Sequence, residues 1–142
     1  MPKIIIHAPE AAFDGHSRQG IANELTEFAL ECERLPKSPF VKSTVWIYFN
    51  TYDADCVFMG EERATTAIIS AQIYVIKGGL DAEAKKTLIN GATAIFGKYL
   101  KVEARIPVYI VIHEIEESNW GIFGNNANLA ALRASAAGAP AI

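Results

Sequence analysis

Two stretches of the chain share one pattern and decide the fold: FDGHSRQGIANELTEFALEC at residues 13–32 and LDAEAKKTLINGATAIFGKY at residues 80–99. Each opens with an apolar residue and an aspartate, Asp14 or Asp81, and aspartate is a favoured N-cap of helices. Apolar side chains then recur at spacings of three and four residues, which predicts an amphipathic helix in each stretch. We interpret the pair as an internal duplication.

Short runs rich in β-branched residues flank each predicted helix. They predict strands at 3–8 and 43–51 in the first half, and at 68–77 and 107–114 in the second. A strand–helix–strand crossover makes the two strands of each half parallel. The predicted fold class is therefore α+β: duplicated β-α-β units forming a four-stranded mixed sheet, with two helices on one face.

The whole chain, residues 1–142, is expected to form a single domain. Unit one spans about 2–62, unit two about 67–124, and an Ala-rich C-terminal tail 125–142. Within this tail, the stretch from Asn125 to about Arg133 is expected to form a short helix against a neighbouring subunit.

The sheet face away from the helices is expected to carry large apolar and aromatic residues, including some of Trp46, Tyr48, Tyr74 and Tyr109. Such a face needs a partner, and a homo-oligomer is the simplest one. Ferredoxin-like and tautomerase-like domains share this order of elements, and periodicity alone does not choose between them.

Composition excludes several classes of function. Hydrophobic residues make up 51% of the 142 residues, and the formal charge is −3, which argues against a nucleic-acid-binding protein. The apolar runs are too short to span a membrane, and the start of the chain has no signal-peptide pattern, so a cytoplasmic protein is expected. The histidines and the two cysteines lack metal-ligand spacing, so we expect no metal and no cofactor.

Pro2 is the strongest candidate for a catalytic residue in the sequence. Cells normally remove an initiator methionine that precedes a small residue such as proline, which would leave Pro2 with a free secondary amine. An α-amino group titrates near neutral pH, and burial or a nearby cation lowers its pKa further. Such a group suits general-base abstraction of a proton next to a carbonyl. With Met1 retained, the nitrogen of Pro2 is an amide and has no basicity.

Three features together resemble the tautomerase superfamily: the opening MPKIII, the duplication, and the segment ESNWGIFG at residues 117–124. The resemblance covers about residues 2–124, and the fused two-unit length is similar to the cis-3-chloroacrylic acid dehalogenase and malonate semialdehyde decarboxylase groups. It implies a tautomerase fold like that of macrophage migration inhibitory factor, a homotrimer, and a cofactor-independent isomerase. Pro2 would be the general base, acting on a small 2-keto or dienoate carboxylic acid.

The resemblance also implies a set of substrate-binding residues. Lys77 stands where the dehalogenase and decarboxylase groups place an arginine, although the second arginine position holds Gly79 or Leu80. Tyr109 aligns with an arginine, and Trp120 with an aromatic residue, of the small tautomerases. Two residues outside these alignments complete the set of candidates: Arg63, a cation able to reach an anion, and His113, on the same strand face as Tyr109.

Other matches to the family are missing. The histidine, tyrosine and glutamate of the cis-dehalogenases fall at about Ala29, at Val111 and near Asn119, which argues against dehalogenation by hydration. Two alternatives therefore stay open. One is a decarboxylase, dehalogenase or hydratase of the same superfamily, with protonated Pro2 as general acid. The other is a non-catalytic oligomeric binding module, which retention of Met1 would favour.

Overall fold

Four strands form one mixed sheet in the computed structural model, which describes residues 1–102 and 105–142. Their order is β2 (Trp46–Tyr52), β1 (Lys3–Pro9), β5 (Ile69–Ile76), β6 (Val108–Ile115). β1 pairs with β2 in parallel, β5 pairs with β6 in parallel, and the central pair β1–β5 is antiparallel. The predicted four-stranded mixed sheet of two β-α-β units is confirmed.

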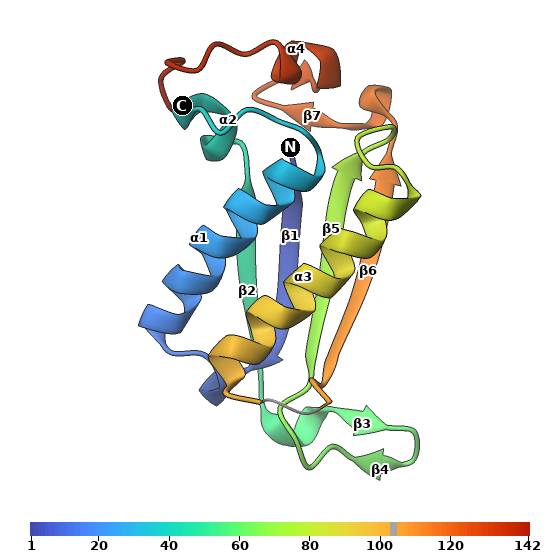
Figure 1. Cartoon of the computed structure of the whole chain (residues 1–142). Helices are drawn as coiled ribbons and strands as arrows, with labels where there is room; N and C mark the ends of the chain where they lie inside the picture. Colours follow the sequence, from blue (N-terminus) through green and yellow to red (C-terminus); the bar gives the residue numbers. More distant parts are fainter. Residues whose placement is uncertain (103–104) are drawn as a thin grey trace.

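The two long helices, α1 (Gly15–Cys32) and α3 (Ala82–Leu100), lie side by side over one face of this sheet (Figure 1). The N-cap predictions are confirmed, since the side chain of Asp14 accepts a hydrogen bond from the backbone N–H of Ser17 and Asp81 accepts one from Ala84. Inward-facing side chains of both helices and of β1 and β5 form the main core. Its fully buried members include Ile4, Ile21, Ile73, Leu88 and Phe96.

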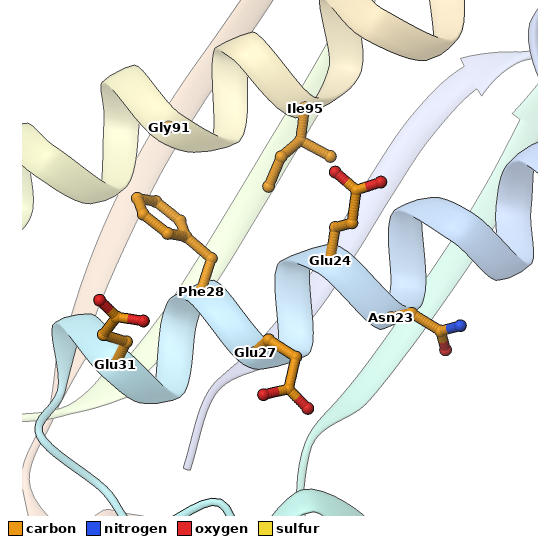
Figure 2. Close-up of a pocket in the computed structure, with 7 residues that line it drawn as sticks. All are labelled: Asn23, Glu24, Glu27, Phe28, Glu31, Gly91 and Ile95. Carbon is orange, nitrogen blue, oxygen red and sulfur yellow. The ribbon is translucent and has the colours of Figure 1, made fainter.

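Close packing of α1 on α3 depends on a glycine. The ring of Phe28 points from α1 towards Gly91 of α3 (Figure 2), and a Cβ at Gly91 would lie 2.1 Å from ring carbons of Phe28. The absent side chain therefore provides the space that Phe28 fills. The two helices can approach each other closely enough to cover the sheet as one layer.

Short elements repeat the duplication at opposite ends of the sheet (Figure 1). The hairpin β3 (Phe58–Met59) and β4 (Glu62–Arg63) follows unit one, and β7 (Gly121–Ile122) and β8 (Asn125–Asn126) follows unit two. Gly60 and Gly124 turn these hairpins with φ of 66° and 80°, a conformation that favours glycine. A 3₁₀ turn precedes each hairpin, η2 (Ala54–Cys56) or η3 (Glu117–Asn119), and a third, η1 (Glu10–Ala12), follows β1.

The structure corrects two boundaries. The strand expected at 43–51 begins only at Trp46, because residues 39–43 form a short helix, α2 (Pro39–Ser43), capped by the side chain of Ser38. The helix expected from Asn125 to about Arg133 is α4 (Leu129–Arg133), and it begins later than expected because Asn125 and Asn126 form β8. Leu132 of α4 is buried in one cluster with Met1.

The sheet face opposite the helices is uncovered, as the sequence predicts. Trp46, Tyr48, Tyr109 and Val111 expose 43%, 43%, 71% and 38% of their surface there. These four side chains, on the two outer strands β2 and β6, are called the open-face residues below. Among the described residues, no helix is both long and apolar enough to cross a membrane.

Replacing Gly91 by alanine should destabilise the protein, although alanine is the better helix former. The new methyl group would push Phe28 out of its place, and we expect a loss of about 1–3 kcal/mol in the free energy of unfolding. Urea denaturation measures this change. Gly15→Ala is the matched control, because a Cβ at Gly15 meets no atom within 4 Å; an equal loss in both variants would contradict the packing role of Gly91.

Candidate active site around the chain start

The first residues of the chain lie inside the protein. Met1 exposes 2% of its surface and Pro2 is buried. Strand β1 is one of the two central strands, so the chain starts at the edge of the core, between the ends of the neighbouring elements. The side chain of Met1 belongs to a second apolar cluster at this end of the sheet, whose other buried members are Leu30, Leu35, Val41, Ile76, Ala127 and Leu132.

A buried carboxylate meets the N-terminal amine. The amine of Met1 donates a hydrogen bond of 2.9 Å to Oε2 of Glu33, the C-cap residue of α1, and Glu33 is fully buried. Burial lowers the pKa of the amine, and the Glu33 carboxylate offsets this only in part. Burial likewise raises the pKa of Glu33, against the opposing effects of the amine and Arg133. These shifts bring the pKa values of the amine and the carboxyl closer together than those of an exposed pair.

Two further segments hold Glu33 in place. A Cβ at Gly79, in the loop after β5, would lie 3.0 Å from Oε1 of Glu33 and 2.9 Å from the carbonyl oxygen of Ile76, so only glycine leaves room for the carboxylate. From α4, Nη2 of Arg133 donates hydrogen bonds to the carbonyl oxygens of Glu33 at 3.0 Å and Gly79 at 3.3 Å. The end of α1, the loop after β5 and the C-terminal helix thus meet at the chain start.

Two cavities share Met1 as a wall. The first, of about 200 Å³, is also lined by Lys3, Trp46, Tyr48 and Trp120. Its cation is Lys3, whose Nζ lies 5.6 Å from the ring centre of Tyr48, within the range of cation–π attraction. The second cavity, of about 250 Å³, lies beneath α4 and the C-terminal residues. Met1 is thus common to both cavities, and Pro2 follows it directly in the chain.

Three of the residues singled out in the sequence lie at this end of the sheet. Trp120 lines the first cavity. Lys77 follows β5, and its Nζ is paired with the carboxylate of Glu116, which raises the pKa of the lysine. His113 stacks on Tyr74, with ring centres 4.6 Å apart. The register of the sheet places Tyr74 opposite Lys3.

The other two lie at the opposite end. Arg63 is exposed in β4, in the hairpin that extends beyond the sheet (Figure 1). Tyr109 is near the start of β6, which runs from that end towards the chain start, and it lines a separate cavity of about 460 Å³ with Phe58 and Arg105. Within one chain, the structure does not bring Arg63 or Tyr109 together with Pro2.

A groove of about 480 Å³ lies on the outer surface between α1 and α3. Figure 2 shows Glu24, Glu27 and Glu31 along α1 and Ile95 on α3. The three carboxylates pair with Lys98, Lys42 and Lys37, respectively, so their charges are already balanced on the helix surface. None of the predicted site residues lines this groove.

One group of side chains has the composition of a metal site. Ligand atoms of Asp53, Asp55 and Cys56 lie within 4.8 Å of one another, and all three residues are exposed. Local desolvation and the nearby aspartates raise the pKa of the Cys56 thiol, which disfavours the thiolate that a metal would bind. This group is not a strong candidate for a metal centre.

Sequence reasoning missed Glu33, although the sequence contains a signal for it. Ile21, Leu25 and Ala29 are buried at intervals of four residues, and the next position in that series is Glu33. A carboxylate that continues a buried apolar stripe needs a partner inside the protein. Arg133 carried no such signal, because only the fold brings α4 against the chain start.

Comparisons with known proteins agree on the fold. Residues 71–128 match the family described as Tautomerase, tautomerase enzyme. N1, a member of the cis-3-chloroacrylic acid dehalogenase family, is 20% identical and superposes with a TM-score of 0.76 over 89% of this chain and 83% of its own. Native fused 4-OT is 18% identical and superposes with a TM-score of 0.70 over 92% of this chain and 98% of its own. No curated protein sequence matches the chain significantly.

A third similar structure is macrophage migration inhibitory factor of Toxoplasma gondii, 17% identical with a TM-score of 0.68 over 88% of this chain and 99% of its own. The fold is therefore that of the tautomerase superfamily. The predicted resemblance to its fused two-unit members is confirmed.

Substitution of Gly79 by alanine should displace the Glu33 carboxylate and so destabilise the protein, although Gly79 lines neither cavity. The added methyl group would collide with the Ile76 carbonyl and the Glu33 carboxylate, and we expect a loss of about 1–3 kcal/mol in the free energy of unfolding. Urea denaturation provides the value. Gly138→Ala serves as control, because nothing lies within 4 Å of a Cβ there. A Gly79→Ala protein as stable as this control would show that Glu33 is not confined as described.

Proposed function

The chain has the tautomerase fold, and its residues 71–128 match the tautomerase family. We propose that the protein is a cofactor-independent tautomerase that uses Pro2 as general base. The substrate would be a small 2-keto or dienoate carboxylic acid. One observation carries the proposal: the chain start is buried beside a cavity, where burial lowers the pKa of a terminal amine. A free amine at neutral pH is what proton abstraction from carbon requires.

The reaction is a proton transfer without change of oxidation state. The lone pair of the Pro2 nitrogen would take a proton from the carbon next to the carbonyl, and the electrons of that C–H bond would form the enolate. Returning a proton to oxygen, or to another carbon of a dienoate, completes the isomerisation. A single amine is able to serve as base and then as acid in the two steps.

Removal of Met1 is a condition of this chemistry. An amide nitrogen at Pro2 has no available lone pair, and the amine of Met1 itself is engaged with Glu33. Since Met1 is 2% exposed, a peptidase would have to remove it before the chain folds. The processed protein would then contain an enlarged cavity at the place of the Met1 side chain.

The proposed substrate site combines groups from both ends of the sheet. Trp120 would form an apolar wall, and Lys3, which lines the first cavity, would attract the carboxylate. Lys77 would add to this attraction by exchanging its present partner, Glu116, for the substrate. Arg63 and Tyr109 would have to come from neighbouring subunits, since they lie at the far end of their own chain. His113 lies on the open face, where it would contact the substrate or a subunit.

We propose a homotrimer for this reason and for two others. The uncovered open face is apolar enough to need a partner. Two similar structures are described as fused 4-OT trimers, one asymmetric and one symmetric, at 17% and 16% identity and with TM-scores of 0.74 and 0.73.

Glu33 favours a second candidate. A carboxylate beside the amine stabilises the ammonium form, which would act as general acid in a decarboxylase or hydratase of the same superfamily. The contact between Met1 and Glu33 also suits a non-catalytic binding module in which Met1 stays attached. The intact mass of the protein from its native host discriminates the module from the enzymes.

Turnover should depend on a free proline amine. We expect protein lacking Met1, verified by intact mass, to catalyse the ketonisation of phenylenolpyruvate, followed by its ultraviolet absorbance. Protein made with Met1 retained should be inactive, and Pro2→Ala should lower kcat/KM by about 10²–10⁴-fold. Pro140→Ala, in the C-terminal tail, is the control. Equal activity with and without Met1 would rule out Pro2 as the base.

The trimer should depend on the open face. Val111→Asp would place a charge in the proposed interface, and we expect sedimentation velocity to show monomers. Ile89→Asp is a closely matched control, because Ile89 is also 38% exposed but lies on helix α3, on the other side of the molecule. Loss of the trimer in both variants, or in neither, would contradict an interface through the sheet.

A further inference from the structure

We propose that Glu33 is the positioning residue for the catalytic amine: once Met1 is removed, its carboxylate binds the secondary ammonium of Pro2 and holds it at the cavity wall. This inference rests on the proposed function of Pro2. It adds a residue that the sequence resemblance did not assign to the site.

Covalent geometry brings the freed amine close to Glu33. The nitrogens of successive residues are at most about 3.7 Å apart, because only two backbone carbons separate them. Oε2 of Glu33 lies 2.9 Å from the nitrogen of Met1. The nitrogen of Pro2 is therefore within about 7 Å of Oε2, even if all atoms stay in place. To form the contact, the Glu33 side chain has to rotate, or the chain start has to move, into the space left by Met1.

The environment of Glu33 favours such a contact. With Met1 absent, the fully buried carboxylate has lost the ammonium that balanced its charge, and a buried charge needs a partner. Its Oε1 already lacks a hydrogen-bond partner among the described residues. A proline ammonium carries two N–H groups, so it is able to donate to Glu33 and to a substrate group together.

The supports of Glu33 limit where its carboxylate can go. Arg133 fixes the backbone carbonyl of Glu33, and Gly79 provides the space at Oε1. Leu30 and Leu35, close to Glu33 in sequence, are buried as well. Gly79 and Arg133 thus restrict Glu33 on two sides, whereas the side of the chain start opens when Met1 is removed.

The expected effect is on the protonation of Pro2. The Glu33 carboxylate would raise the pKa of the amine, against the lowering effect of burial, and so keep the proton available for return to the substrate. Other charged or titratable groups around the pair are Arg133 on α4, Cys32 on α1, and Arg34 after α1, which is paired with Asp81. Lys3 follows Pro2 on β1.

A titration tests the proposal without substrate. Protein labelled with ¹⁵N-proline and free of Met1 gives the pKa of Pro2 from its nitrogen chemical shift. We expect Glu33→Gln to lower this pKa by about 1 or more. Glu31→Gln is the matched control, since Glu31 lies two residues away on α1 with an exposed side chain paired to Lys37. An unchanged pKa in Glu33→Gln, or an equal decrease in the control, would overturn the proposal.

Two further measurements keep the proposal testable. The first applies if Glu33→Gln does not fold, and the second separates loss of the carboxylate charge from a change in side-chain shape. In the unsubstituted protein, the carboxyl ¹³C shift of Glu33 should change over the pH range in which Pro2 titrates; a flat response there would overturn the proposal. Glu33→Asp keeps a carboxylate and should recover part of the lost pKa. A pKa equal to that of Glu33→Gln would mean that charge is not the cause.

Measuring tautomerase activity together with the pKa of Pro2 distinguishes failure of the Glu33 contact from failure of the proposed function. If Pro2 is the base, Glu33→Gln should move the rise of kcat/KM with pH to lower pH, because the amine loses its proton earlier. A shifted Pro2 pKa in a protein without turnover supports the Glu33 contact and rejects the tautomerase. Turnover that requires Pro2 but an unshifted pKa supports the tautomerase and rejects the Glu33 contact.

Discussion

The position of the chain start depends on one constraint: β1 is paired with another strand along both of its edges. Because β2 lies on one side of β1 and β5 on the other, the first strand occupies the centre of the sheet and not its margin. The start of the chain is then flanked by a strand on each side. It is enclosed by the end of α1, the loop after β5 and the C-terminal helix α4. The terminal amine of Met1 is therefore buried.

This burial has an electrostatic cost that the fold offsets with one side chain. An ammonium taken out of water costs several kcal/mol unless a partner and hydrogen bonds compensate it. Glu33 is that partner, and Arg133 and Gly79 keep it in place. The arrangement works against maximal stability, since an apolar cluster would fill the same space at less cost. It suits a protein that needs an amine with altered proton affinity next to a cavity.

Periodicity predicted most of the fold, because each helix and strand has a local cause. The aspartates at 14 and 81 cap helices, and the alternation along β2 correctly separates Ile47 and Phe49 from Trp46 and Tyr48. The site was less predictable. Glu33 is 31 residues from Pro2 in sequence and Arg133 is a further hundred away, and contacts of that kind depend on the assembled sheet. Pro2 could be proposed from the sequence because its chemistry depends only on its position behind Met1.

The central claim is that the amine of Pro2 does the chemistry, and competitive acetylation tests it most directly. At pH 6.5, exposed lysines are almost fully protonated and react slowly with acetic anhydride, whereas a terminal amine, whose ordinary pKa is well below that of lysine, reacts first. Peptide mapping of protein lacking Met1 should find the first acetyl group on Pro2, and tautomerase activity should fall in proportion to that label. Full acetylation of Pro2 with activity retained would contradict the claim.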